Sequence, residues 1–351
     1  MLIFFKQWWW KYTAILLLLY VLIGGLTVPL GPGIKSIDPI TFQSDTLIDF
    51  VVTGFNTHFI DAGDAQVWFK NGTDFYCATQ VTPIINSTAR VGFRLHNIDR
   101  THLTNHSFDI VLNDKIDGTI TLRDAVALLS ASATHDSITA PTPTCSPLVA
   151  VAKFQHFAFP YREVLYQTIR NTFYHVPMWF SMMLILICSL IFSIRYLSSG
   201  NSMDDIIASQ AVNVALLFGV LGLLTGMMWA TYTWGSPWPN DPKLNGAAVG
   251  VIIYLAYIVL RGSLNDEIKR AKISAVYNVF AIVIFTLFIF IIPRLTDSLH
   301  PGNGGNPAFS KYDLDSHLRL FFYPAVIGWA LLGFWILSLA VRIQLLQEKN
   351  T

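Results

Sequence analysis

Charged residues are scarce in this sequence. Only 13% of its 351 residues are Asp, Glu, Lys or Arg, whereas an average soluble protein contains about a quarter. Hydrophobic residues make up 53% of the chain and aromatic residues 14%. This balance excludes an ordinary soluble globular protein and predicts an integral membrane protein. The net charge of +1 gives no reason to expect a nucleic acid partner.

Cysteines and nucleotide-binding motifs are also scarce. The three cysteines Cys77, Cys145 and Cys188 form no CxxC pair, so neither a thiol redox motif nor a cysteine zinc site is expected. Cys77 and Cys145 lie in a polar region and are candidates for a disulfide on the outer side of a membrane, although sequence alone does not decide their geometry. No GxxxxGK[ST] motif occurs. We therefore expect no enzyme here, and any nucleotide hydrolysis has to come from a partner.

Long apolar runs take the place of charge. Six candidate membrane spans lie at roughly 13–30, 176–197, 209–231, 246–260, 274–292 and 320–341. Each is long enough, or nearly so, to cross an apolar layer of about 30 Å as a helix. The first run lacks a cleavage site of the signal-peptide type, so we expect an uncleaved helix. The tryptophans just before it, Trp8 to Trp10, are typical of an interfacial belt.

The composition turns polar between the first and second runs. Stretches at 46–55, 65–79, 89–96 and 107–112 alternate apolar and polar residues between Asn, Asp and Gly turns. This pattern predicts short antiparallel strands of a sandwich-like domain. A helix over Leu122–Ala133, capped by Thr121 or Asp124, is expected to follow. The Pro- and Thr-rich segment at 140–147 is typical of a linker.

The predicted fold is therefore an all-α polytopic membrane protein with six transmembrane helices and an inserted extracytoplasmic β-rich domain. The expected parts are a first helix at 1–30, the insertion at 31–150, a five-helix membrane domain at 151–345 and a cytoplasmic tail at 346–351. The densest basic loop, with Arg261, Lys269, Arg270 and Lys272, lies between the fourth and fifth spans. Basic loops stay in the cytoplasm, so both termini are expected there as well.

A loop at 229–245 joins the third and fourth spans and holds three tryptophans, three prolines and an aspartate. On the expected topology it lies on the outer face, between His175 at the start of the second span and His300 just past the fifth. Imidazoles are the usual axial ligands of haem iron, and Trp234 and Trp238 have flat apolar faces to pack on a porphyrin. The alternative is that these residues only anchor the chain at the membrane boundary. Zinc or copper is disfavoured because no third ligand has a fixed spacing to the histidines.

Three arginines are expected on the outer face, although basic residues are usually cytoplasmic: Arg170, Arg294 and Arg319. They are candidates for contacts with the anionic propionates of a haem. The alternative is that they extend to phospholipid head groups. Asp241 is a candidate cap for the fourth span, and Asn245 competes for that role.

The segment WGSPWPND at Trp234–Asp241 is similar to the tryptophan-rich WWD signature of haem-handling membrane proteins. The segments FYHVPMW and LHPG resemble the two flanking histidine motifs of the CcmC family, the six-span haem delivery proteins of cytochrome c maturation. The resemblance covers roughly residues 160–345. It implies that haem b is bound at the outer face with His175 and His300 as axial ligands, and that the loop members are Trp234, Gly235, Trp238 and Asp241. Pro237 and Asn240 stand where richer forms of the signature have aromatic residues.

The resemblance also implies partners. Haem would be passed to a CcmE-like chaperone, with the CcmAB ABC transporter and a CcmD-like subunit alongside, in the cytoplasmic (inner) membrane and with the haem site facing the periplasm. A competing hypothesis is a membrane receptor or assembly factor whose β-rich domain binds a protein partner. A CcsA-like cytochrome c synthetase is a third; it is disfavoured because none of the nine histidines lies inside a predicted span.

Overall fold

The computed structural model describes residues 8–43, 47–94, 106–129, 153–296, 298–300 and 314–350; the side chain of Arg294 is outside the description. The chain divides into two compact units. One consists of the N-terminal helix and everything from Thr168 onward, and the other runs from Val28 to Gln167. The second unit contains the whole of the predicted insertion and extends beyond it at both ends.

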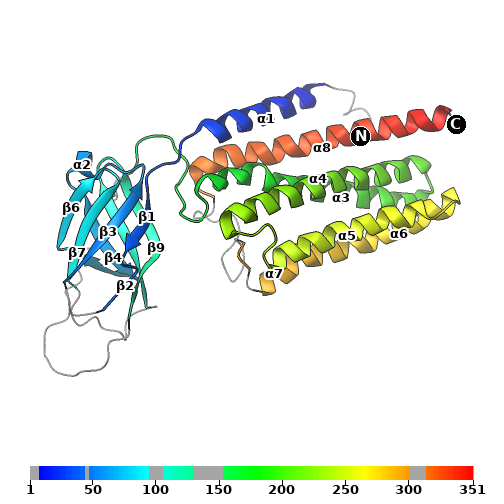
Figure 1. Ribbon diagram of the computed structural model, residues 1–351. Helices are drawn as coiled ribbons and strands as arrows, with labels where there is room; N and C mark the ends of the chain where they lie inside the picture. Colours follow the sequence, from blue (N-terminus) through cyan, green and yellow to red (C-terminus); the bar gives the residue numbers. More distant parts are fainter. Residues whose placement is uncertain are drawn as a thin grey trace. The chain divides into compact units, whose positions relative to one another are not determined.

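The first unit is helical (Figure 1). Its elements are α1 (Trp9–Thr27), most of the 3₁₀ helix η2 (Tyr166–Phe173), α3 (His175–Ser199), α4 (Ser202–Trp234), α5 (Pro242–Gly262), α6 (Glu267–Thr286), the π-helical segment η3 (Leu287–Ile291), α7 (Ile292–Leu295) and α8 (Ser316–Asn350). Six helices in the described part of the chain are long and apolar enough to cross a membrane, in agreement with the six predicted spans. Most of these helices are longer than the predicted spans because they continue into polar residues, whereas α1 ends at Thr27, before the predicted residue 30.

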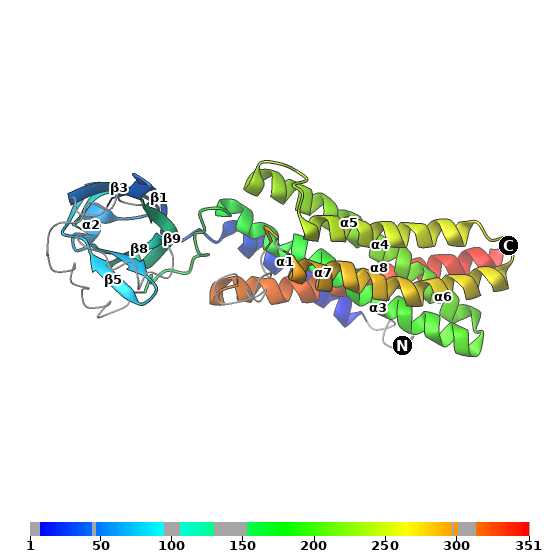
Figure 2. The ribbon, with the colours of Figure 1, turned by 90° about the horizontal axis from the view of Figure 1, so that it is seen from below.

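The helices contact one another in pairs. α1 packs along α8, α3 along α4, and α5 along α6, and α3 also contacts α6 and α8 (Figures 1 and 2). The end of α4, the start of α5 and the first turn of α3 lie at one end of the bundle, and the last turn of α8 lies at the other (Figure 1). This alternation brings chain segments that are far apart in sequence to the same end.

The second unit is a β-sandwich. Its elements are β1 (Gly33–Asp38), β2 (Thr41–Phe42), β3 (Leu47–Phe55), the short helix α2 (Phe59–Ala62), β4 (Gln66–Asn71), β5 (Asp74–Cys77), β6 (Gln80–Ile85), β7 (Thr88–Arg94), β8 (Ser107–Asp114) and β9 (Gly118–Leu128). One sheet has the order β1-β3-β7-β6 and the other β2-β9-β8-β4-β5.

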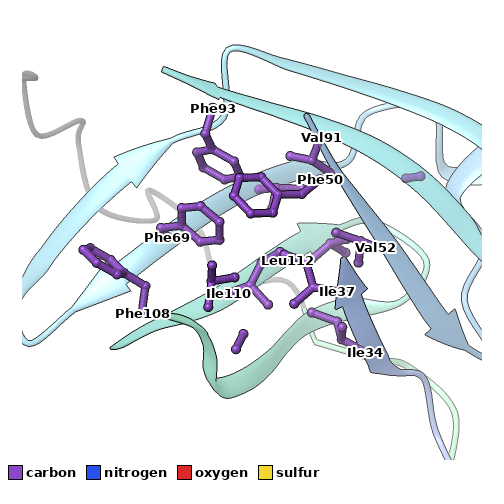
Figure 3. Close-up of a cluster of buried hydrophobic side chains, with 14 of the residues drawn as sticks. Ile34, Ile37, Phe50, Val52, Phe69, Val91, Phe93, Phe108, Ile110 and Leu112 are labelled. Carbon is purple, nitrogen blue, oxygen red and sulfur yellow. The ribbon is translucent and has the colours of Figure 1, made fainter. Parts of the chain in front are cut away.

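The two sheets share one hydrophobic core (Figure 3). Phe93 on β7 and Phe69 on β4 stack across it, with their ring centroids 3.8 Å apart and their planes 13° from parallel. Phe50 meets the Phe69 ring edge-on at 5.2 Å. Alternation of inward apolar and outward polar residues along each strand places these rings in the core. The predicted β-rich region is therefore confirmed.

The helix predicted over Leu122–Ala133 is wrong. Residues up to Leu128 belong to β9, where Leu122 pairs with Ile110 of β8, and residues 130–133 lie outside the description. Asp124 is not a helix cap. It sits at an irregularity of the β8–β9 pairing with a φ of +48°, and its N–H donates to Oδ1 of Asp109. Asp tolerates this left-handed conformation better than most residues, and a local pattern does not reveal the pairing with β8.

Other details of the insertion also differ. The predicted strand at 65–79 is two strands, β4 and β5, joined by a turn at Gly72, whose φ is +57°. Three strands were missed altogether, β1, β2 and β6. Cys77 is disulfide-bonded and Cys188 is a free, buried thiol. Cys145 and the predicted linker at 140–147 lie outside the described residues.

Candidate functional site

The connection between α4 and α5 is shorter than the predicted loop at 229–245. α4 continues through Trp234 and ends at Gly235, whose φ of +75° and N–H bond to the carbonyl of Thr231 form a left-handed cap. α5 begins after Asp241, whose Oδ1 accepts from the N–H groups of Lys243 (2.9 Å) and Leu244 (3.3 Å). Nothing before Gly235 stops a helix, so the first six residues of the predicted loop are helical.

Asp241 also holds the segment that follows α7. Its Oδ2 accepts from the N–H of Leu299 at 2.7 Å, and its Oδ1 lies 3.2 Å from Nδ1 of His300. The carboxylate is almost completely buried, with 1% of the side chain exposed. Asp241, rather than Asn245, therefore caps α5, and the same side chain joins the α4–α5 connection to His300.

The electrostatics of this pair favour an ionised aspartate and a neutral histidine. Burial by itself would raise the pKa of Asp241, but hydrogen bonds from Ser298 and Leu299, with His300 nearby, lower it below the ordinary value. Burial lowers the pKa of His300 to about 4, against the opposing effect of Asp241 and together with that of Lys243. A neutral imidazole beside a carboxylate donates its Nδ1–H, which leaves the lone pair on Nε2.

Two tryptophans hold the ring of His300 from the side of α4. The imidazole centroid is 4.8 Å from that of Trp234 and 5.4 Å from that of Trp229. Trp229 and Trp234 meet each other edge-to-face at 4.7 Å. Rings in contact at these distances restrict the rotation of an imidazole. The orientation of His300 is thus set by Asp241 on one side and by two indoles on another.

Among the three tryptophans of the predicted loop, Trp229, Trp234 and Trp238, the last is the most exposed. Solvent reaches 37% of its surface. Its Nε1–H donates to Oδ1 of Asn245 at 3.1 Å, and Nδ2 of Asn245 donates to Oδ1 of Asn240, also at 3.1 Å. The Asn at position 240, where richer forms of the signature have an aromatic residue, therefore helps to support Trp238 through Asn245.

His175 is the first residue of α3 and faces α4. Its Nδ1 lies 3.0 Å from the carbonyl oxygen of Gly222 and 3.1 Å from Oγ1 of Thr225. A carbonyl oxygen only accepts, so Nδ1 carries the proton and Nε2 keeps its lone pair. The approach is close because α4 has glycines here. A Cβ at Gly226 would lie 2.7 Å from Cε1 of His175, and one at Gly222 would lie 2.9 Å from Cε2 of Trp179.

His175 and His300 line one pocket of about 160 Å³. The remaining lining residues are Trp179, Gly222, Leu223, Gly226, Met227, Trp238, Lys243, Leu244, Ala247 and Ile289. Sites for small molecules commonly enclose about 300–1,000 Å³, so a ring as large as a porphyrin would extend beyond this pocket. Among the described residues, the lining is apolar apart from the two imidazoles, the indole N–H groups and Lys243.

The π-helical segment shapes one wall of the pocket through Ile289. Four residues after Ile289 comes Pro293, which has no N–H and whose ring crowds the carbonyl of the residue four positions earlier. A local widening of the helix relieves this conflict. From the sequence, only the end of the fifth span at residue 292 is predicted, and the contribution of Pro293 to the site is not.

The structure brings most of the predicted site residues together. His175, His300 and Trp238 line the pocket, Trp234 and Asp241 contact His300, and Gly235 ends α4. The predicted arginines are placed differently. Nη1 of Arg170 donates to the carbonyl of Gly25 at 2.5 Å and Nε of Arg319 donates to that of Leu314 at 2.9 Å, and neither residue lines the pocket.

Lys243 is a basic residue on the pocket wall that was not among the predicted site residues. The signal was its position two residues after Asp241, in the first turn of α5. Gly222 and Gly226 were missed as well, although four-residue spacing of small residues is typical of closely packed membrane helices.

The chain matches the family model described as heme exporter protein C, CcmC, over residues 140–351, which is more than half of its length. The protein belongs to this family. The resemblance drawn from the three sequence motifs is therefore confirmed at the level of the family.

Curated relatives agree with this family. A heme exporter protein C of Paracoccus denitrificans is 24% identical over 176 residues, covering 50% of this chain and 70% of the relative. One of Bradyrhizobium diazoefficiens is 27% identical over 146 residues, covering 41% of this chain and 55% of the relative. A cytochrome c biogenesis protein CcsA of Prochlorococcus marinus is 35% identical over a shorter stretch of 80 residues, or 23% of this chain and 25% of the relative.

Proposed function

We propose that this protein binds haem between His175 and His300 and delivers it during cytochrome c maturation. Membership of the heme exporter protein C family supports a role in haem delivery. One observation carries the ligand assignment. Both imidazoles line one pocket, and each has its Nδ1 bonded to an acceptor that leaves Nε2 available. Metal-binding histidines almost always have such a partner on the second nitrogen.

The residues of the pocket match the chemical needs of haem. Two neutral imidazole nitrogens suit axial ligation of the iron. The indole face of Trp238 and the side chains of Leu223, Leu244 and Ile289 give apolar contacts for the porphyrin. The chain has no CxxCH motif for covalent attachment, so the form proposed is haem b.

The propionates need cations, and Lys243 is the candidate on the pocket wall. Arg170 and Arg319 already donate to backbone carbonyls, which makes them poorer candidates in the arrangement described. Arg294 stays a prediction, since its side chain is outside the description.

The proposed orientation places the site on the periplasmic side of the cytoplasmic membrane, with both termini in the cytoplasm. An even number of spanning helices puts both termini on the same side of the membrane, and the last turn of α8 lies at the end of the bundle opposite the site (Figure 1). The basic residues Arg261, Lys269, Arg270 and Lys272 lie at the end of α5 and in the first turns of α6, which agrees with a cytoplasmic location. A reporter inserted between Gly235 and Asn240 should be extracytoplasmic, and one inserted between Ser263 and Asp266 cytoplasmic. The reverse result would overturn this orientation.

The proposed acceptor of the haem is a CcmE-like chaperone, with the CcmAB transporter and a CcmD-like subunit as further partners. This part rests on the family alone. In this scheme the protein forms and breaks no covalent bonds of the porphyrin; it holds the iron until a competing ligand takes it.

The test is the visible spectrum of the purified protein after loading with haem. The wild type should show the low-spin pattern of an iron with two imidazole ligands. The double variant His175→Ala, His300→Ala should lose it, whereas His156→Ala, an exposed histidine of the second unit, should not change it. An unchanged low-spin spectrum in the double variant would exclude the ligand assignment.

A second candidate function is a receptor or assembly factor in which the β-sandwich binds a protein. Strand β6 favours it, because β6 is an edge strand and exposes most of its residues, among them Ile84 (49%) and Ile85 (53%). The paired substitutions Ile84→Lys and Ile85→Lys distinguish the two functions. Loss of haem delivery with normal haem loading would favour the receptor, and full delivery would favour the haem carrier.

A further inference from the structure

The two imidazoles of the pocket have different surroundings. His300 has a buried carboxylate as its partner, Oδ1 of Asp241 at 3.2 Å. Within the described part of the chain, the acceptors of His175 are uncharged: the carbonyl of Gly222 and the hydroxyl of Thr225. The hydroxyl of Thr225 in turn donates to the carbonyl of Leu221 at 2.8 Å, so it is already committed within α4.

We infer that His175 and His300 are unequal ligands, and that Asp241 is the positioning residue which makes His300 the stronger of the two. This inference rests on the proposed haem function of the same site. Asp241 would not touch the iron; it would act only through the imidazole of His300.

The first physical reason is the charge of the acceptor. A hydrogen bond to a carboxylate is roughly twice as strong as one between neutral groups, and it increases the electron density that the opposite nitrogen offers to a metal. Burial of Asp241 strengthens the effect, because little water screens the pair. The neutral partners of His175 polarise its ring less.

The second reason is position on a helix. His175 is the first residue of α3, where the exposed N–H groups carry partial positive charge. That field withdraws electron density from a nearby imidazole. His300 lies outside any helix of the described chain. The positive end of α5 acts instead on Asp241, the residue that caps this helix.

The third reason is rigidity. Asp241 accepts from the N–H groups of Lys243, Leu244 and Leu299 as well as facing His300, so the carboxylate cannot turn away from the ring. Any movement of the α4–α5 connection must therefore move the partner of His300. The consequence is an order of release, in which the bond from iron to His175 breaks first when another ligand competes.

The first test uses the protein without haem. Serine at position 241 still caps a helix but is too short to reach the ring, so Asp241→Ser removes the partner and keeps the cap. With ¹⁵N-labelled histidine, NMR at pH 7.5 should show His300 as a single tautomer with the proton on Nδ1. Asp241→Ser should give a mixture for His300 and leave the signal of His175 unchanged. A proton on Nε2 of wild-type His300, or no change in the variant, would overturn the role of Asp241 whether or not haem binds.

The second test uses haem-loaded protein and two matched variants. Asp241→Asn keeps an oxygen acceptor and removes only the charge, while Thr225→Val removes a neutral acceptor from His175. Loss of the charge should favour ferrous over ferric haem by about tenfold, an upward shift of about 59 mV for a one-electron couple. Thr225→Val should shift the ratio less than twofold. Equal shifts in the two variants would mean that the ligands are equivalent.

The third test is a ligand exchange with carbon monoxide on ferrous haem. One iron–nitrogen bond breaks and one iron–carbon bond forms, without a change of oxidation state. If His175 leaves first, the carbon monoxide complex of His175→Ala should have the vibrational spectrum of the wild-type complex, and that of His300→Ala should differ. The opposite pattern would contradict the order of release. Absence of bound haem in the wild type would instead refute the proposed function and leave the NMR result to decide the role of Asp241.

Discussion

Gly226 and His175 lie so close that a Cβ at the glycine would be 2.7 Å from Cε1 of the imidazole. The contact joins α4 to the first turn of α3, where Nδ1 of the ring lies 3.0 Å from the carbonyl oxygen of Gly222. Because a Cβ at this separation has no room, either the helix or the ring has to move. The glycine at position 226 thus decides where one of the two candidate ligands lies.

Gly226→Ala is therefore expected to weaken haem binding. Displacement of His175 would lengthen its bond to Gly222, and loss of such a partner typically lowers metal affinity about 10–100-fold. Haem titration followed by absorbance measures the effect. Gly262→Ala is the matched control, since a Cβ at that glycine has nothing within 4 Å. Equal affinity of Gly226→Ala and wild type would show that His175 does not depend on this contact.

Trp234→Leu should also weaken haem binding, by roughly tenfold. The indole lies 4.8 Å from the ring of His300 and limits its rotation, and a residue that positions a metal ligand commonly contributes about this much. The variant should bind haem with a broadened low-spin signal in electron paramagnetic resonance. Trp9→Leu, at an exposed position of α1, should leave both affinity and line shape unchanged.

The stability of the folded protein should depend on pH through the protonation of His300. Its folded-state pKa, about 4, is below the value of 6.5 expected when unfolded. The unfolded chain therefore takes up a proton first, so stability is fully present above pH 6.5 and falls as the pH is lowered towards 4. The loss attributable to this group is about 3 kcal/mol at most. Thermal unfolding of haem-free protein in detergent between pH 7.5 and 4 measures it, and the His300→Gln variant should show a flatter dependence. Parallel curves for the two proteins would rule out this contribution.

The ion pair between Arg261 and Asp205 should stabilise the end of the bundle opposite the pocket. Nη1 and Nη2 of the arginine donate to the two carboxylate oxygens at 2.8 and 2.6 Å, and 18% and 13% of the two side chains are exposed. Removing one partner of a buried pair leaves an uncompensated charge and costs about 3–5 kcal/mol. Asp205→Leu should lower the melting temperature more than the double variant Asp205→Leu, Arg261→Leu. A double variant less stable than either single variant would contradict this.

The six helices could be predicted from the sequence because the signal is local. An apolar run of sufficient length has few structures open to it in a membrane, where every backbone N–H and C=O must be bonded within the segment. The strands β3, β7 and β8 also followed from local alternation. The strand β9 did not, because its partner β8 and the irregularity at Asp124 determine it.

The same division holds at the site. Chain order, the tryptophans and the two histidines pointed from sequence alone to the end of the bundle where the pocket lies. The contacts between these side chains could not be predicted in the same way. The carboxylate of Asp241 contacts the ring of His300, 59 residues further on, and the acceptor of His175 lies 47 residues away in α4. The place of Lys243 on the pocket wall likewise depends on how α5 packs beside α4. A sequence records which groups are present and how local segments fold, whereas hydrogen bonds between distant segments exist only once helix packing has brought their atoms within about 3 Å of one another.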